Sequence, residues 1–161
     1  MSDISPILPA TETQQLNDAY LAARRCSAQW RAFLAALAVE LHVGTEREEV
    51  LAFLRAVGRR MAGRLPLTPK DTLPELEVAM NEVWGQVDWG WTRLRPIDDG
   101  IAIIHGAYPT AFETEGVMWS AGAAAVLEGV YAAWFEAQGS PLTTLKRMSE
   151  STMPLEFLHG R

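Results

Sequence analysis

The chain has 161 residues, 48% of them apolar, and fourteen basic against twenty acidic side chains give it a net charge of −6. This length and composition predict one domain with a full-sized core. The acidic balance makes nucleic acid and anionic membranes poor partners. Cys26 is the single cysteine, which excludes an intrachain disulfide and a cysteine-based zinc site. The first residues lack the basic and apolar segments of a secretory signal, so we expect a cytoplasmic protein.

Residues 1–25 are expected to form a mobile arm and the start of a helix, ahead of one domain over residues 26–161. The arm is polar and contains Pro6 and Pro9, which disfavours a packed structure. Helical spacing then runs from about residue 15 to residue 41, as one helix or as two joined near Cys26. We interpret Cys26 as a buried, inert thiol. The expected core stripe of this segment is Trp30, Phe33, Leu34, Leu37 and Leu41.

A second helical segment follows Gly44 and runs to about residue 64. Thr45 and Glu48 have the spacing of a capping box. Acidic residues crowd its first turn and arginines its last, which is the arrangement that the helix dipole favours. An anion site at these arginines is the weaker interpretation.

A third helix is predicted after the proline-rich linker of residues 65–75. Thr72 and Glu75 repeat the capping-box spacing. The helix must end at Gly85 or near Gly90, because the period changes from helical to alternating after residue 87.

Residues 88–95 alternate as a strand does, and a turn at Asp99–Gly100 makes residues 101–105 the partner strand of a hairpin. One side of the first strand would carry Trp89, Trp91, Arg93 and Arg95. Residues 142–148 and 154–159 predict a second hairpin. The sum is an α+β domain in which three to four helices pack with a four-stranded, largely antiparallel sheet.

The longest apolar segment, residues 119–138, predicts a core helix. A second stripe of this helix has almost no side-chain volume and consists of Gly122, Ala125, Gly129 and Ala133. Two glycines inside a helix cost roughly 1 kcal/mol each relative to alanine, so the close approach that they allow should have a use. That use is either packing within the chain or a contact between subunits. Ser120, Glu128 and Glu136 argue against a membrane span.

The search for chemistry gives no catalytic, cofactor-binding or metal-binding residues. No nucleophile elbow, phosphate loop or metal motif is present. Glu128 and Glu136 could form the carboxylate pair of a glycan hydrolase, but a structural role is the stronger interpretation. The tryptophans at residues 84, 89 and 91 cluster near one junction, and Trp89 and Trp91 beside two arginines suit a subunit interface or a flat platform for a sugar ring.

These residues resemble a known family in five ordered motifs: VGRRMAGR (57–64), MNEVWG (80–85), VDWGWTRL (87–94), IIH followed by Pro109, and W...VLEGVYAAW (119–134). The pattern, from about Phe33 to Trp134, is similar to the bacterial cellulose synthase operon protein D family. None of the motifs is a catalytic signature.

The resemblance implies a non-catalytic accessory protein of cellulose secretion. It implies a ring-shaped homo-octamer built from dimers, with passages for emerging glucan chains, or a scaffold that arranges synthase complexes in a row with a proline-rich partner. Other synthase subunits are implied partners. The residues alone leave an alternative, a small-molecule sensing or adaptor module of the four-vinyl-reductase type, which would contain an internal apolar pocket.

Overall fold

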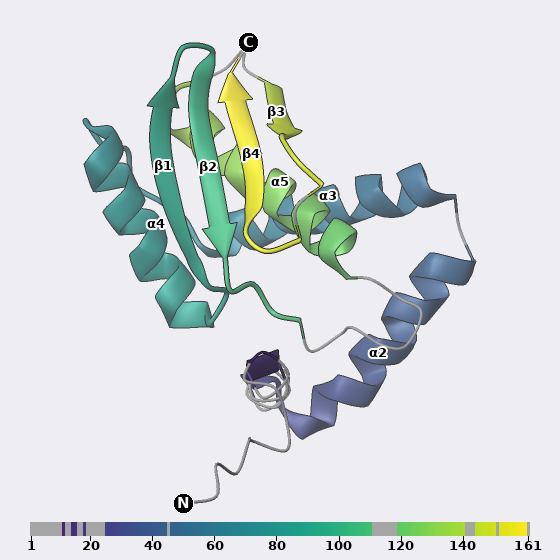
Figure 1. Ribbon diagram of the computed structural model, residues 1–161. Coiled ribbons are helices and arrows are strands. Elements are labelled where there is room, and N and C mark those ends of the chain that lie inside the picture. Colours follow the sequence, from purple (N-terminus) through teal and green to yellow (C-terminus); the bar gives the residue numbers. More distant parts are fainter. Residues whose placement is uncertain are drawn as a thin grey trace, which may run out of the picture.

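The computed structural model describes residues 25–44, 46–110, 119–140, 144–150 and 152–160, together with Thr11, Gln14, Gln15 and Asp18. These residues form helices and an antiparallel sheet, so the predicted α+β class is confirmed (Figure 1). The elements are α2 (Ala28–Val43), α3 (Arg47–Arg64), α4 (Leu73–Val87), β1 (Trp91–Ile97), β2 (Gly100–Gly106), α5 (Ser120–Ala137), β3 (Thr144–Arg147) and β4 (Leu155–Gly160). Most of the predicted mobile arm lies outside the described residues.

The sheet has the strand order β1-β2-β4-β3, and every neighbouring pair is antiparallel. Ile97 pairs with Gly100 across a two-residue turn, which confirms the first predicted hairpin. The second hairpin is also confirmed, and β4 inserts beside β2 with Ile103 opposite Phe157. The C-terminal strand thus completes the middle of the sheet.

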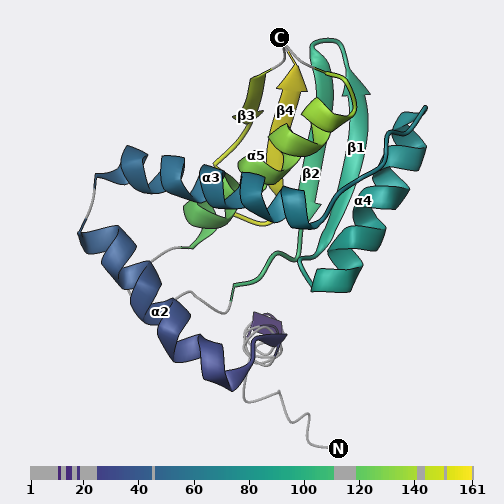
Figure 2. The same ribbon diagram turned by 180° about the vertical axis from the view of Figure 1, so that it is seen from behind.

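The helices α3 and α5 lie together on one face of the sheet (Figures 1 and 2). Period-two alternation turns the side chains of Leu94, Ile103, Leu155 and Phe157 into that layer, where each is at most 3% exposed. They meet Trp84, Tyr131 and Trp134 in one cluster. The opposite sheet face has no described helix over it.

The helix α4 begins as predicted: the Thr72 side chain accepts from the Glu75 amide, and the Glu75 carboxylate accepts from the Thr72 amide. It ends at Val87 because Asp88 adopts a left-handed φ of 55° and Gly90 a φ of 97°. The alternative stop at Gly85 is wrong, since Gly85 lies inside the helix.

Side chains of α4 also cover the outer edge of β1. The Asn81 amide exchanges hydrogen bonds of 2.9 Å with both the N–H and the C=O of Thr92. The Glu77 carboxylate accepts from the Leu94 amide at 2.7 Å. Two polar side chains therefore replace a neighbouring strand, and this edge is not open to strand addition.

The helix α5 packs closely against α3 at a pair of glycines. A Cβ atom built on Gly129 would lie 2.0 Å from the carbonyl oxygen of Arg55, and one built on Gly58 would lie 2.0 Å from that of Val126. The backbones thus meet without an intervening side chain. The prediction that Gly129 marks a close approach is confirmed, and its neighbour belongs to the same chain.

Two details at the N-terminal side differ from expectation. The N-cap of α3 is Glu46 and makes no side-chain cap hydrogen bond, so the predicted cap by Thr45 is wrong; Thr45 itself lies outside the described residues. The helix α2 begins at Ala28, after a break at Cys26 and Ser27, which agrees with a junction near Cys26. The Cys26 thiol is half-exposed rather than buried, because α2 packs little against the domain.

Candidate assembly surfaces

The helix α2 carries an apolar stripe that the domain does not cover. Trp30, Phe33 and Leu37 are 52%, 57% and 41% exposed, and Ala38 is the buried residue of the helix. The expectation that this stripe belongs to the core is therefore wrong. The reason is position: α2 leaves the body of the domain beyond the start of α3 (Figure 2). Periodicity identified the apolar face correctly but not its partner.

The exposed stripe has an ordered aromatic end. Trp30 and Phe33 meet edge to face with ring centroids 5.9 Å apart. Leu34 and Leu41 lie along the same face at helical spacing and are half-buried. Further exposed apolar side chains are Val39 and Val43 on α2 and Phe53 and Val57 on α3. With about 150–250 Å² for each aromatic ring, more than half of it exposed, the total reaches the largest apolar patches that monomers tolerate.

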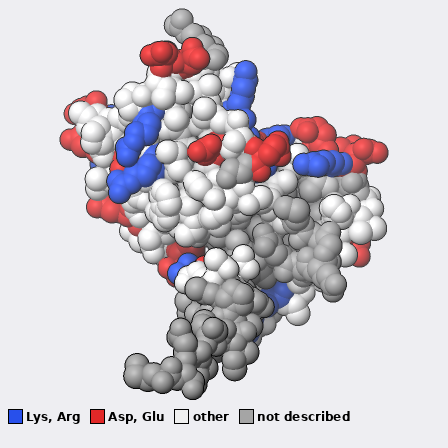
Figure 3. Space-filling view, in the orientation of Figure 1, with Lys and Arg blue, Asp and Glu red and all other residues white. Residues whose placement is uncertain are grey.

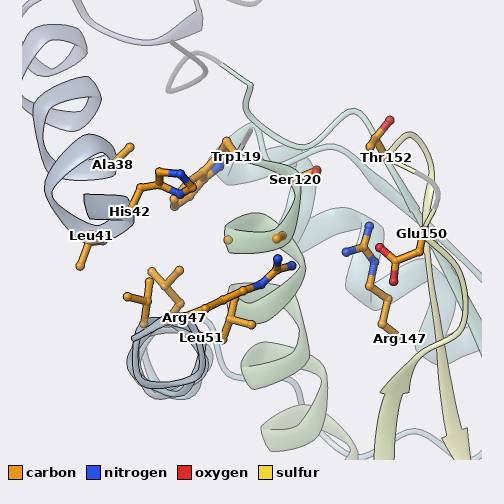
Figure 4. A pocket seen from close by; sticks show the side chains of 14 residues that line it. Ala38, Leu41, His42, Arg47, Leu51, Trp119, Ser120, Arg147, Glu150 and Thr152 are labelled. Atoms are coloured by element: carbon orange, nitrogen blue, oxygen red, sulfur yellow. The ribbon is translucent and has the colours of Figure 1, made fainter. Parts of the chain in front are cut away.

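A hollow of about 480 Å³ lies where α2 approaches the body (Figure 4). Leu41 lines it from α2, Leu51 and Leu54 from α3, and Trp119 from the start of α5. Polar groups surround this apolar floor: His42, Arg47, Arg147, Glu150 and Thr152. Sequence reasoning missed the hollow, because no local pattern reports the angle between α2 and α3.

The open face of the sheet is the second uncovered surface. Trp91 is 44% exposed, and Arg93 and Arg95 follow it on the same side, as the alternation predicts. The Trp91 indole lies across Gly106 of β2, where a Cβ atom would lie 2.4 Å from the ring. Figure 3 shows this face, with basic side chains gathered toward the β1 side and a largely uncharged centre.

Trp89 does not share this face, so its predicted place beside Trp91 is wrong. Gly90 turns the chain between them, and β1 begins only at Trp91. Trp89 instead stacks on Trp84, with ring centroids 6.3 Å apart, and is half-buried.

The two arginines of the face are held by Glu77 of α4. The Arg93 guanidinium lies 2.7 Å from one Glu77 oxygen, and that of Arg95 lies 3.8 Å from the other. Burial works to raise the pKa of Glu77, but the hydrogen bond from the Leu94 amide and the two arginines outweigh it, so the pKa is lower than usual. Glu77 thus links the strand edge to the charges of the open face.

The small-residue stripe of α5 faces its own chain. Gly122 lies against the Trp119 ring and Leu54, Gly129 lies against the α3 backbone, and Ala125 is 2% exposed. Ala133 is half-buried and packs against the main core. Of the two uses that the sequence left open for this stripe, the structure shows packing within the chain.

The two α5 glutamates are ion-paired with arginines of α3. The Glu128 carboxylate lies 2.6 Å from the Arg55 Nε atom, and Glu136 forms two hydrogen bonds of 2.8 and 3.0 Å with Arg59. The hydrogen bonds from Arg59 hold the pKa of Glu136 below its usual value. A glycosidase acid needs the opposite shift, so this arrangement suits helix packing rather than hydrolysis.

A buried polar chain crosses the core. His105 Nε2 lies 2.8 Å from the Trp89 carbonyl oxygen and must carry the proton, so Nδ1 accepts from the Tyr131 hydroxyl at 2.6 Å. Burial lowers the pKa of His105 to about 4, and the ring is neutral at pH 7. His159 in β4 stacks on Phe135 with ring centroids 4.0 Å apart. Across the described ranges, no cluster of three potential metal ligands occurs, and no helix has the length and apolarity to cross a membrane.

Comparison with known proteins identifies the family. A family model for the D component of cellulose synthase matches residues 16–157. Cellulose synthase operon protein D of Komagataeibacter xylinus is 34% identical over 111 residues, which are 66% of this chain and 69% of the relative. The protein of that name from Komagataeibacter sucrofermentans is 32% identical over 111 residues, with the same coverage. These matches exclude the four-vinyl-reductase alternative, and the chain belongs to the cellulose synthase operon protein D family.

Proposed function

We propose that the protein is a non-catalytic accessory component of bacterial cellulose biosynthesis that acts by assembling with copies of itself. The observation that carries this proposal is the exposed apolar stripe of α2 in a member of the cellulose synthase operon protein D family. Trp30, Phe33 and Leu37 are costly to leave in water, and tryptophans dominate the energetics of many interfaces. Burial against another chain removes that cost.

The proposed assembly is a closed ring of dimers, an octamer by family resemblance. It would order synthase complexes or guide glucan chains for export and crystallisation, together with other synthase subunits, and a proline-rich scaffold protein is a further candidate partner. A protein that works through its surfaces in this way needs more than one contact, because a single two-fold contact stops at a dimer. The stripe of α2 and the Trp91, Arg93 and Arg95 face offer two separate surfaces.

The absence of catalysis is supported by how the carboxylates are used. Glu128 and Glu136 are each bound to an arginine and neither is available as a protonated acid in the arrangement described. Incubating the purified protein with cello-oligosaccharides tests this directly. Any cleavage that is lost in both Glu128→Gln and Glu136→Gln would contradict the proposal.

The proposal is tested first by mass. Size-exclusion chromatography with light scattering on the native chain of 17.8 kDa should give a closed oligomer at micromolar concentration, with eight copies as the expected number. A monomer overturns the assembly.

The second test is biological. In a cellulose-producing bacterium that lacks its own cellulose synthase operon protein D, expression of this protein should restore the yield and crystallinity of the cellulose. Cell fractionation should place the protein in the cytoplasm. Restored assembly without any effect on cellulose would overturn the role but not the oligomer.

A further inference from the structure

We infer that two copies pair through α2 in antiparallel orientation, with Trp30 of one copy seated over Leu41 at the mouth of the other copy's hollow. This inference rests on the proposed function, because it names the contact through which the assembly begins. It follows from the spacing of the stripe, the place of the hollow and the amount of exposed apolar surface.

The spacing of the stripe is the same in both chain directions. Four side chains lie on one helix face at intervals of four, three and four residues: Trp30, Leu34, Leu37 and Leu41. This is the interval of side chains that interlock between two helices. An antiparallel copy therefore meets the stripe in register, with Trp30 opposite Leu41 and Leu34 opposite Leu37. A two-fold axis between residues 35 and 36 generates all four layers.

The two ends of α2 have complementary shapes. The N-terminal end presents the large exposed rings of Trp30 and Phe33, which contact each other but lack cover from the described body of the domain. The C-terminal end, at Leu41 and His42, borders the hollow of about 480 Å³. Antiparallel pairing brings each aromatic end to a hollow end. Parallel pairing would place the tryptophans together and leave both hollows open.

The exposed surface suits this occupant. Three aromatic rings and four aliphatic side chains of α2 and α3 are between 37% and 76% exposed, which adds up to roughly 500 Å² of apolar surface with about 150–250 Å² available for each aromatic ring. One partner in a stable complex contributes about 800 Å² in total, of which somewhat more than half is apolar. The stripe is therefore of the right size for a second copy.

Disulfide trapping tests the pairing. In a Cys26→Ser background, differently tagged Trp30→Cys and Leu41→Cys chains are co-expressed and oxidised. Antiparallel pairing predicts that the mixed species crosslinks and that neither variant crosslinks with itself. Residues 30 and 41 of one helix are about 16 Å apart at 1.5 Å per residue, so a bond within one chain is excluded. Parallel pairing predicts the reverse, self-crosslinking of each single variant, which would overturn the inference.

A second pair keeps the test valid if the loss of Trp30 weakens assembly. Leu34→Cys with Leu37→Cys probes the inner layers and leaves both aromatic rings in place. Val39→Cys, on the opposite side of α2 and 37% exposed, is the matched control and should not crosslink. A native oligomer in which neither mixed pair crosslinks overturns this contact while the proposed function stands. A native monomer overturns both.

Discussion

The helices α5 and α2 are both apolar, yet one is the most buried element of the domain and the other one of the most exposed. Twelve residues of α5 are buried, against Ala38 alone in α2. The difference lies in what each helix meets. The helix α5 has glycines and alanines that fit the backbone of α3, whereas α2 presents large rings that meet no described neighbour of that size. An apolar stripe therefore requires a partner without saying whether the same chain supplies it.

The largest expected effect breaks the closed side of this comparison. Gly129→Ala would place a Cβ atom 2.0 Å from the Arg55 carbonyl oxygen, and backbone cannot move aside as a side chain can. We expect a loss of about 3 kcal/mol in the free energy of unfolding, the upper range for overpacking. Urea denaturation measures it.

The matched control is Gly85→Ala, which adds a methyl group to an exposed position of α4 with no atom within 4 Å. It should be neutral or stabilise the protein by about 0.5–1 kcal/mol, because alanine favours the helix. Equal destabilisation by the two substitutions would mean that the α3–α5 contact is looser than described.

The second effect concerns the core beneath α5. His105 has a pKa of about 4 in the fold and about 6.5 when unfolded, so the unfolded chain binds more protons between these values. Stability from the neutral ring is full above pH 6.5 and falls as the pH drops toward 4, by up to about 1.4 kcal/mol per pH unit. His105→Gln should be less stable at pH 7 and show a shallower slope over this window. Urea titrations at several pH values measure both slopes, and identical slopes would show that His105 titrates normally.

The third effect sharpens the α3–α5 contact at its polar border. Arg55 donates to Glu128, whose side chain is 14% exposed, and to Glu48, whose side chain is 77% exposed. Glu128→Gln should cost about 1 kcal/mol and Glu48→Gln nearly nothing, because solvent screens the exposed pair. A double-mutant cycle with Arg55→Met isolates the pair energy. A larger loss from Glu48→Gln would reverse this assignment.

Much of the fold is predictable from local patterns. The capping box at Thr72, the two hairpins and the apolar face of α5 are each encoded within a few residues, and the structure confirms them. The place of Trp89 is not, because a single positive φ at Gly90 turns the chain and ends the alternation. Likewise, the sequence names Gly129 as a close approach without naming α3 as its neighbour.

The candidate surfaces were predictable to different degrees. Alternation places Trp91, Arg93 and Arg95 together correctly, since a strand face depends only on parity. The stripe of α2 was found as a stripe but assigned to the core, because its exposure depends on the angle at Gly44 to Arg47. Tertiary geometry of this kind has no local signal. The hollow beside α2 depends on the same angle.

The smallest expected effect on the fold belongs to the open side of the comparison. Replacing Trp30 and Phe33 together by serine removes two rings that are more than half exposed and that cover little of the described core. Helix content measured by circular dichroism should stay the same, while light scattering should show a lower oligomeric mass than for the native protein. Val39→Ser, which changes the opposite side of α2, should keep the native mass. An insoluble or unfolded double variant would show that the stripe stabilises the single chain, and α2 would then belong with α5 rather than in contrast to it.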